Sequence, residues 1–539
     1  TRIRSNRVGL AASTSDPGSA SEGDIYYDST NNQVKTYDGS SWSAIQGSGS
    51  LEAVASGSLS NGQTVILQSD GTVTGVAATS RTQSVGSKVN YSAEGGYSYI
   101  NSAVYDPDNK KIIVFYYNTS DSNNSRYAVG TVSGTSISFN AGIAWNSSRM
   151  FYVSPIYDSD QQKIVIAYRN SSDSNRGYAR AGSFDGTTIT FGSEVAFTNS
   201  DEDAAWISGA YDSINQKILI AYENYQSATG YTGRAVVATV SGTSISFGNP
   251  KTYIPYRADE TSVSYNPDEG KFVIASRTRT SELSPYPGYI VASTAEIKGS
   301  SFHLGGAFEA FDLGNGGYTM GLSCIYDSSA KKHVIFFSTS NDNPVRTKAV
   351  VTTIEGTSLS FADPVNIDSD EETESAAAAY DPNAKKIVVV YKDKTTFREH
   401  GTYVVGSIVG TAITFGTPSE FESAEYQELR ATYDSDQERV VVTFRDSDNS
   451  NNGAARVFQN AFSGSNVTEG NFIGFSDAAY SDGDTAKVQL VSTIDDAQSG
   501  LTAGSKHYVQ NDGSLGTTAD DPSVIAGTAL SGTEILIKQ

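Results

Sequence analysis

The 539-residue sequence is poor in several residue types, and each shortage removes a class of protein. Its single cysteine, Cys324, excludes an internal disulfide framework and any zinc site built on cysteines. With 38 Lys and Arg against 60 Asp and Glu, the net charge of −22 argues against nucleic acid as a partner, because phosphate neutralisation needs clustered basic side chains. No apolar run reaches the roughly 18 residues of a membrane-spanning helix, so no membrane insertion is expected.

Motifs for metals, cofactors and nucleophiles are also scarce. The four histidines form no ligand or nucleophile pattern, and their positions are His303, His333, His400 and His507. The segment DSDNSNNG at 446–453 has oxygen ligands at alternate positions, as a calcium loop does, but lacks the distal Glu. Related stretches at 120–125 and 172–177 favour a hairpin tip instead, and whether calcium binds stays open. We therefore expect no cofactor, metal ligand or catalytic residue.

The residues that are abundant favour β structure. The chain holds 32 Tyr, 22 Phe and 50 Gly, and no long stretch has apolar residues at helical spacing. Aromatic and β-branched residues suit a half-buried pleated surface, and glycines suit the tight turns between strands. The sequence predicts an all-β protein.

A repeat settles the expected architecture. A few small residues, then Tyr-Asp or Tyr-Asn, then a turn and an apolar strand recur with spacings of 52, 54, 54, 61, 54 and 53 residues. The marker tyrosines are Tyr105, Tyr157, Tyr211, Tyr265, Tyr326, Tyr380 and Tyr433. Such a period, with several strands in each copy, indicates a β-propeller, here with seven blades.

Each copy is predicted to hold four strands, as at 376–381, 386–391, 403–408 and 412–415 in the sixth. The seventh copy lacks a good fourth strand. Residues of about 80–91, which lie ahead of the first copy, align with the fourth strand of other copies. We expect this segment to pair with the third strand of blade seven, because closing the ring removes exposed strand edges.

The expected domain boundaries follow from the repeat. Residues 80–469 form the seven-bladed propeller, and 51–79 and 470–539 carry similar turn and strand elements on either side of it. One small β domain with the propeller inserted is the simpler interpretation, and two separate β modules are the alternative. Residues 1–50 contain GDIYYDSTNNQVKTYDGSSW, two alternating strands around a turn, and form an N-terminal β-hairpin module. Since an isolated hairpin is unstable in water, it should dock on a partner.

The flanking modules resemble virion proteins of tailed bacteriophages, in particular tail-fibre and spike-like appendages. The hairpin at 23–42 is similar to a module near the virion end of fibres, and 471–539 is similar to a terminal domain of such proteins. The resemblance implies a virion structural protein that attaches to other virion proteins through its N-terminal module. It also implies a homo-oligomer, with a trimer favoured, assembled in the host cytoplasm and displaying a domain to the host surface. The absence of an apolar export signal after TRIRSNRVGL agrees with this expectation.

The rim of variable loops is the expected place for recognition, because loops on a rigid scaffold carry binding function. The residue twelve positions after each marker tyrosine falls at this rim, and four of the seven are basic. These seven are Tyr117, Arg169, Glu223, Arg277, Ser338, Lys392 and Arg445. The longer loops of blades three and four add the tyrosines Tyr225, Tyr231, Tyr256, Tyr286 and Tyr289.

From these two sets we expect a receptor-binding rim for a host-surface glycan or protein, made of Tyr117, Arg169, Glu223, Arg277, Lys392, Arg445, Tyr225 and Tyr286. Ordinary solvated strand ends and loop packing are the alternative explanations of the same residues.

Three functions are compatible with this pattern. The leading hypothesis is a non-enzymatic phage appendage that presents the propeller for host recognition. A capsid-bound head fibre or decoration protein is the first alternative, and a surface-polysaccharide depolymerase is the second. A glycosidase needs two carboxyl groups, one with a raised pKa, and the acidic loops at 200–205 and 368–375 read more simply as solvated turns. The sialidase aspartate boxes are missing from the repeat.

Overall fold

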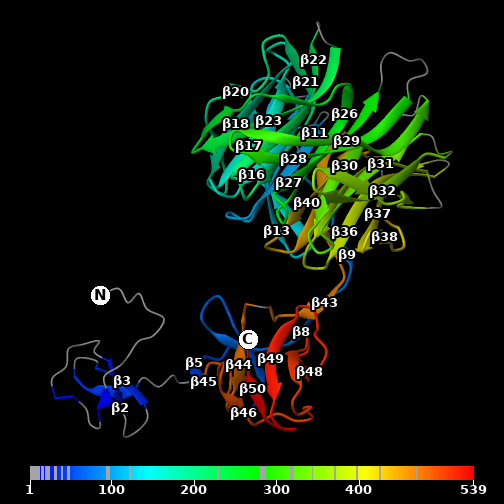
Figure 1. The fold of residues 1–539 in the computed structure, drawn as a ribbon. Coiled ribbons are helices and arrows are strands. Elements are labelled where there is room, and N and C mark those ends of the chain that lie inside the picture. The colour runs from blue at the N-terminus through cyan, green and yellow to red at the C-terminus, as the bar shows by residue number, and fades with distance from the viewer. Residues whose placement is uncertain are drawn as a thin grey trace. The chain divides into compact units, whose positions relative to one another are not determined.

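The computed structural model describes residues 12–13, 17–18, 25–28, 33–37, 40–44, 49–92, 98–119, 124–226, 230–279, 287–315, 321–340, 342, 344–368, 372–395, 398–423, 426–468 and 470–538. Every regular element in this part of the chain is a β-strand, and no helix there could cross a membrane. The chain divides into two compact units, residues 81–461 and residues 1–80 with 462–539 (Figure 1). The predicted fold class, an all-β seven-bladed propeller with small β modules, is confirmed.

The N-terminal module is a four-stranded sheet in the order β1-β2-β3-β4. Its strands are β1 (Ala12–Ser13), β2 (Ile25–Asp28), β3 (Gln33–Tyr37) and β4 (Trp42–Ala44). The expected hairpin is the antiparallel pair β2–β3, in which Asp28 faces Gln33. The Trp42 indole packs 5.4 Å from the Tyr37 ring and donates its Nε1–H to the carbonyl of Pro17 at 3.1 Å.

The small β domain combines chain from both sides of the propeller in two five-stranded sheets. The first sheet consists of β5 (Ser50–Val54), β6 (Thr64–Leu67), β7 (Val73–Gly75), β44 (Phe472–Ser476) and β45 (Thr485–Gln489). The second consists of β46 (Ile494–Asp495), β47 (Lys506–Val509), β48 (Leu515–Gly516), β49 (Val524–Ala529) and β50 (Ile535–Ile537). Ile66, Phe472 and Phe475 of the first sheet share one core with Val509 and Ile535 of the second.

The chain passes between the two units through β8 (Ala78–Arg81) and β43 (Phe462–Ser465), which pair with each other. Residues 462–468, expected at the end of the propeller, therefore belong to the other unit.

The propeller is built of seven antiparallel sheets within the described residues. Blade one has β11 (Ser98–Asp106), β12 (Lys111–Asn118), β13 (Ser125–Ser133), β14 (Ser136–Phe139) and β15 (Ile143–Asn146). Blade two has β16 (Met150–Asp158), β17 (Lys163–Asn170), β18 (Arg176–Phe184), β19 (Ile189–Phe191) and β20 (Val195–Ala196). Blade three has β21 (Glu202–Asp212), β22 (Lys217–Gln226), β23 (Gly230–Ser241), β24 (Ser244–Phe247) and β25 (Lys251–Ile254).

The remaining blades repeat this order. Blade four has β26 (Arg257–Asn266), β27 (Lys271–Arg279), β28 (Pro287–Lys298) and β29 (Ser301–Asn315). Blade five has β30 (Leu322–Asp327), β31 (Lys332–Thr339), β32 (Arg346–Glu355), β33 (Ser358–Phe361) and β34 (Val365–Asn366). Blade six has β35 (Glu372–Asp381), β36 (Lys386–Thr395), β37 (Arg398–Val409), β38 (Ala412–Phe415) and β39 (Ser419–Glu422). Blade seven has β40 (Tyr426–Asp434), β41 (Arg439–Asp446) and β42 (Asn452–Gln459), completed by β9 (Ser84–Val85) and β10 (Val89–Asn90).

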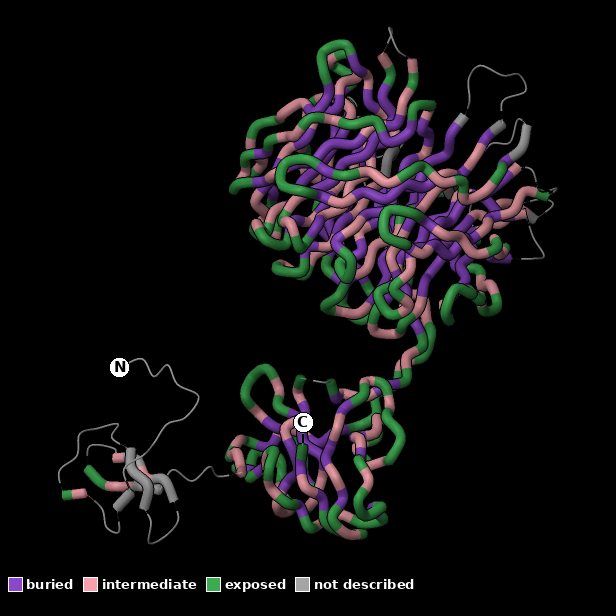
Figure 2. The backbone as a smooth tube through the Cα atoms, viewed as in Figure 1, coloured by how far each residue is buried: buried purple, intermediate pink, exposed green. Residues whose placement is uncertain are grey.

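The core lies between neighbouring blades, where the second strand of each is covered on both faces. All eight residues of β41 are buried, and Ile220 and Tyr222 of β22 share a core with Val165 and Ala179 of blade two. Figure 2 shows the buried backbone inside the propeller and the exposed backbone at its turns. Each fully buried Val, Ile or Phe side chain contributes about 1.5–3 kcal/mol, so these continuous apolar runs hold adjacent blades together.

The repeated Tyr-Asp marker has a structural cause. In every blade the Asp or Asn side chain accepts backbone N–H groups two and three residues on, as Asp212 Oδ1 does from Ile214 and Asn215, both at 2.9 Å. In four blades the marker tyrosine then donates to the turn of the preceding blade, as Tyr265 Oη does to Asp212 Oδ1 at 2.6 Å. The marker therefore fastens one blade to the next.

The strand that closes the ring comes from the N-terminal side of the propeller. β9 and β10, within the predicted segment 80–91, both pair antiparallel with β42, and Val89 faces Ala455. Tyr91 follows β10 and is buried between blades seven and one, with its ring 5.3 Å from that of Tyr116 and 5.6 Å from that of Phe139. A Cβ atom on Gly453 would lie 2.2 Å from the Tyr91 ring, so a glycine is needed there.

We predict that Tyr91→Ala lowers the free energy of unfolding by about 3–5 kcal/mol, the usual cost of truncating a buried aromatic residue. Gly453→Ala should also destabilise the propeller, but it should cost little in a Tyr91→Ala background, where the ring that it strikes is gone. Urea unfolding of both single variants and the double variant measures this coupling. Additive effects of the two substitutions would contradict the proposed packing.

Candidate functional site

A bulge near the start of the inner strand, present in every blade of the described chain except the fifth, shapes the centre of the propeller. One extra residue of the first strand interrupts its pairing with the second, between Ala205 and Ser208 in blade three for example. The residue five positions before the marker tyrosine, which lies within the bulge where there is one, has positive φ in six blades: Tyr152, Trp206, Glu260, Gly321, Ser375 and Glu428. A residue other than glycine in this region costs about 1–3 kcal/mol, and such strain is typical of sites where a side chain must be aimed.

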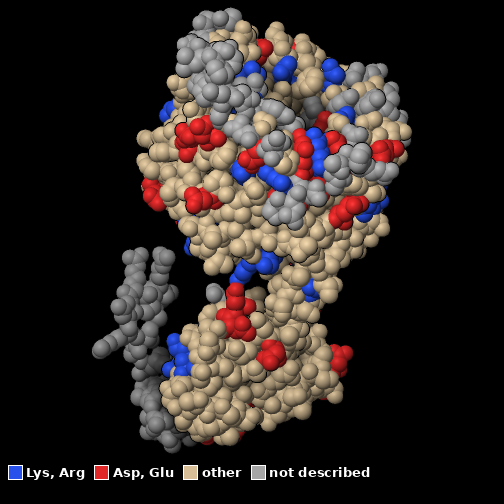
Figure 3. Space-filling view, turned by 90° about the vertical axis from the view of Figure 1, so that its right-hand side faces the viewer, with Lys and Arg blue, Asp and Glu red and all other residues tan. Residues whose placement is uncertain are grey.

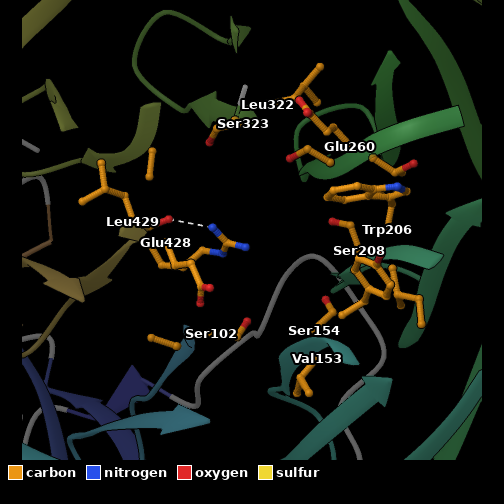
Figure 4. Close-up of a pocket in the computed structure, with 18 of the residues that line it drawn as sticks. Ser102, Val153, Ser154, Trp206, Ser208, Glu260, Leu322, Ser323, Glu428 and Leu429 are labelled. Carbon is orange, nitrogen blue, oxygen red and sulfur yellow. Dashed lines mark hydrogen bonds between the residues drawn. The ribbon is translucent and has the colours of Figure 1, made fainter. Parts of the chain in front are cut away.

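These residues surround a cavity of about 730 Å³ (Figure 4). All seven inner strands contribute to it, from β11, β16, β21, β26, β30, β35 and β40. The bulges lie at the end of the inner strands where the second strands finish, which is the rim of variable loops. The bulge layer of the cavity therefore lies toward the rim that the sequence indicated.

Aromatic rings form one wall of this cavity, on blades one to three. The Tyr152 and Trp206 ring centroids are 5.0 Å apart, and the Phe151 centroid is 6.0 Å from that of Tyr117. Two guanidinium groups lie over these rings: Arg149 is 4.8 Å from the Phe151 centroid, and Arg169 is 5.7 Å from the Tyr152 centroid. Within the described chain neither arginine makes an ion pair. This wall offers apolar faces and positive charge together.

Hydroxyl groups form a second layer, three positions before the marker tyrosine. Five blades place a serine there and line the cavity with it: Ser102, Ser154, Ser208, Ser262 and Ser323. Three of these hydroxyl oxygens accept a backbone N–H of the next blade's inner strand, as Ser262 Oγ does from Cys324 at 2.9 Å. A hydroxyl that accepts such a bond still has its own hydrogen to donate. In Figure 4 the labelled serines surround the open centre.

The other blades break the sevenfold pattern. Blade six has Ala377 in the serine layer, and blade seven has Arg430, whose Nη1 donates to the carbonyl of Leu429 at 2.7 Å, the dashed line in Figure 4. In the bulge layer, Glu260 and Glu428 bring carboxyl groups to opposite sides of the cavity. Blade five has Gly321 there and no side chain, and a Cβ would lie 2.9 Å from the backbone of Ser375. The lining therefore differs from blade to blade, as a site for an asymmetric ligand requires.

A buried charge network lies beside the aromatic wall. Arg257 Nε lies 3.1 Å from Glu223 Oε2 and 2.8 Å from Asp259 Oδ1, and Glu223 faces Ala205, the residue before Trp206. Burial and the neighbouring Asp259 raise the pKa of Glu223 to about 7, against the opposing effect of Arg257. The acidic segments expected to be solvated turns, 200–205 and 368–375, do not contain this carboxyl pair, and Glu202 and Glu374 within them are buried.

The structure divides the predicted receptor-binding rim. Tyr117 and Arg169 belong to the aromatic wall, whereas Glu223 and Arg277 are 4% exposed and Arg445 is 5% exposed. These three face the inner strand across the bulge and lie among polar partners, as in the 3.8 Å approach of Arg277 Nη2 to Asp259 Oδ2. Their burial removes them from the exposed surface that a receptor would touch.

The remaining rim positions differ in exposure. Lys392 is partly buried and ion-paired with Glu399. Tyr225 is exposed and stacks 4.6 Å from Tyr231, away from the cavity lining. Tyr286 lies outside the described residues.

The residues that sequence reasoning missed are on the inner strands. Counting back five and three positions from each marker tyrosine would have found both layers, including Trp206, Glu260 and Arg430. Counting forward twelve positions from the marker reaches the second strand instead, and so misses the side chains that the inner strand directs into the cavity.

The fold occurs in solved structures with little sequence similarity. An ulvan lyase, described as a new family of polysaccharide lyase bound to -[GlcA(1-4)Rha3S]-, is 10% identical with a TM-score of 0.47, covering 69% of this chain and 95% of its own. The Dos1 propeller is 12% identical with a TM-score of 0.41, covering 70% and 95%. A Hadza microbial sialidase is 10% identical with a TM-score of 0.37, covering 63% and 73%. No protein-family model and no curated protein sequence matches the chain.

These comparisons correct one expectation. The chain was expected not to be an enzyme, and this is contradicted because its structural neighbours include a lyase and a sialidase, which are enzymes. At such low identity the similarity concerns the fold, and it assigns neither neighbour's activity to this chain.

The raised pKa of Glu223 predicts an unusual pH dependence of stability. The folded state holds this proton up to about pH 7, whereas an exposed Glu releases it near pH 4.5, so this contribution is lost as pH rises between the two values. Glu223→Gln should remove about 1–3 kcal/mol of the loss between pH 5 and 8. Urea unfolding at both pH values measures it, with the exposed Glu269→Gln as control. An unchanged pH dependence in Glu223→Gln would contradict the assignment.

Proposed function

We propose that the propeller binds a cell-surface glycan in its central cavity. The observation that carries this proposal is the wall formed by Tyr152 and Trp206, aimed into a cavity of about 730 Å³ by strained bulges. A sugar ring has an apolar face that stacks on an aromatic side chain and hydroxyl groups at its edge that need hydrogen-bonding partners. Trp206 supplies the aromatic surface for stacking, and the serine layer with Glu260 and Glu428 supplies the hydrogen-bonding partners.

The setting proposed for this binding is a phage virion. The resemblance of the flanks to tail-fibre and spike-like modules supports it, with the N-terminal sheet as the attachment to other virion proteins and a homotrimer as the assembly. A capsid-bound position is the alternative location. Immunogold labelling of intact particles distinguishes tail from capsid, and light scattering of the full chain measures the number of subunits. Absence of the protein from purified particles would contradict the virion setting.

The glycan proposal predicts that Trp206→Ala weakens binding about tenfold, the equivalent of about 1.4 kcal/mol of lost stacking. Calorimetric titration with host envelope polysaccharide measures the affinity. Trp206→Gly is a second variant, because glycine accepts the φ of 50° at this position without strain and occurs there in blade five.

The matched control is Tyr256→Ala, which removes a 51% exposed aromatic side chain that lies outside the cavity lining. Loss of affinity in Tyr256→Ala, with none in Trp206→Ala, would place recognition on the loops and overturn the cavity as the site.

Cleavage of the bound glycan is a second candidate function. Glu260 and Glu428 favour it, because two carboxyl groups on opposite sides of one sugar-sized cavity are the equipment of glycoside hydrolysis. Release of reducing ends from the same polysaccharide tests it. Hydrolysis should fall at least a hundredfold in Glu260→Gln and Glu428→Gln, far more than glycan binding, because the amide keeps a hydrogen-bonding oxygen but cannot transfer a proton. No release by the wild-type chain would leave binding as its role.

A further inference from the structure

Arg430 is the one residue of the serine layer that no packing requirement explains. At the same position the other blades have serine or alanine. Small side chains are therefore sufficient for the inner strands to pack around the axis. Blade seven instead directs the longest cationic side chain into the cavity. Its bond to Leu429 is to the carbonyl of the preceding residue, so it joins Arg430 to nothing beyond its own strand.

The guanidinium group of Arg430 has room for a ligand. The side chain is surrounded by protein yet open to the solvent of the cavity, and burial lowers its pKa while Glu428 opposes this. Among the described residues no carboxylate lies within 4 Å of it as an ion pair. One donor is used by Leu429, which leaves the other N–H groups of the fork to bind an acceptor.

One of the two acidic groups in the bulge layer is paired outside the serine layer. Glu260 Oε1 lies 3.9 Å from Arg277 Nη1, on the second strand of its own blade. The two glutamates also lie in the bulge layer, two residues nearer the variable rim than Arg430 in the register of the inner strand. Arg430 shares its layer with serine hydroxyls, which can donate hydrogen bonds to the same ligand group.

We propose that Arg430 and the serine layer form a subsite for the negatively charged group of an anionic saccharide, a carboxylate or a sulfate ester. A planar guanidinium binds either group through two parallel N–H donors, and a bond of this type is about twice as strong as one between neutral groups. In this arrangement the aromatic wall binds the sugar ring. Arg149 and Arg169 attract the anionic polysaccharide to the entrance of the cavity, and Arg430 binds its negatively charged group. On the face shown in Figure 3 acidic and basic side chains are interspersed, so this face offers no continuous positive patch to an anionic polysaccharide.

This inference rests on the proposed glycan function and gives it a substrate class. The experiment is calorimetric titration of the full chain with host envelope polysaccharide, before and after carbodiimide-mediated reduction of its carboxylates and after desulfation. Loss on carboxyl reduction identifies a uronate-type ligand, and loss on desulfation identifies a sulfated one.

Arg430→Gln should weaken binding of the anionic polysaccharide at least tenfold and flatten its salt dependence, and Arg430→Lys should recover part of the affinity. The same substitution at Arg180, which stacks on Phe191 in the outer part of blade two, is the matched control and should change neither. Thermal unfolding should be unchanged in Arg430→Gln, because the residue holds only its neighbour's carbonyl.

Equal affinity for the charged and the neutralised polysaccharide, or an Arg430→Gln variant that binds as the wild type does, would overturn the anionic subsite. Should Trp206→Ala still weaken binding in that case, the glycan function would stand without it. Absence of binding to every polysaccharide form would instead overturn the proposed function and this inference together.

Discussion

The bond between a tyrosine of one inner strand and the turn of the preceding blade is the interaction on which the propeller depends. The Tyr326 hydroxyl donates to Asp268 Oδ2 at 2.7 Å, and the Tyr380 hydroxyl donates to Ser329 Oγ at 2.7 Å. At the junction of blades one and seven, the Tyr105 hydroxyl accepts the backbone N–H of Asp436. Each bond fixes the spacing of adjacent inner strands. The apolar second strands then pack face to face, and the central cavity takes its width from the ring so formed.

The bulge works against this regularity and creates the site. It interrupts the pairing of the inner strand just before the marker, where the residue adopts a left-handed conformation and its side chain turns toward the axis. Glycine would satisfy the backbone in every blade, as Gly321 does in blade five. Tryptophan, tyrosine and glutamate in the same conformation raise the free energy of the folded state, so their presence supports a role in binding.

Charge in this acidic protein acts locally. Burial and Asp259 both disfavour the charged form of Glu223 and raise its pKa to about 7, while Arg430 stays accessible inside the cavity. The net charge of −22 predicted neither, since the pKa of a carboxyl group depends on neighbours that only the folded chain supplies.

The amino-acid sequence by itself determined the number of blades, the marker turn and the segment from which the closing strands come. All three follow from strands and turns that repeat with the period of one blade. Periodicity reports which strand a residue occupies, and Tyr105 or Asp212 could be placed by counting. It does not report how a bulge shifts the register. The sequence therefore put Glu223, Arg277 and Arg445 on an open rim, where the tertiary structure buries them opposite the bulge. Only the closed ring brings Trp206, Glu260 and Arg430, from blades three, four and seven, to one cavity, since contacts around an axis exist only after all the blades have packed.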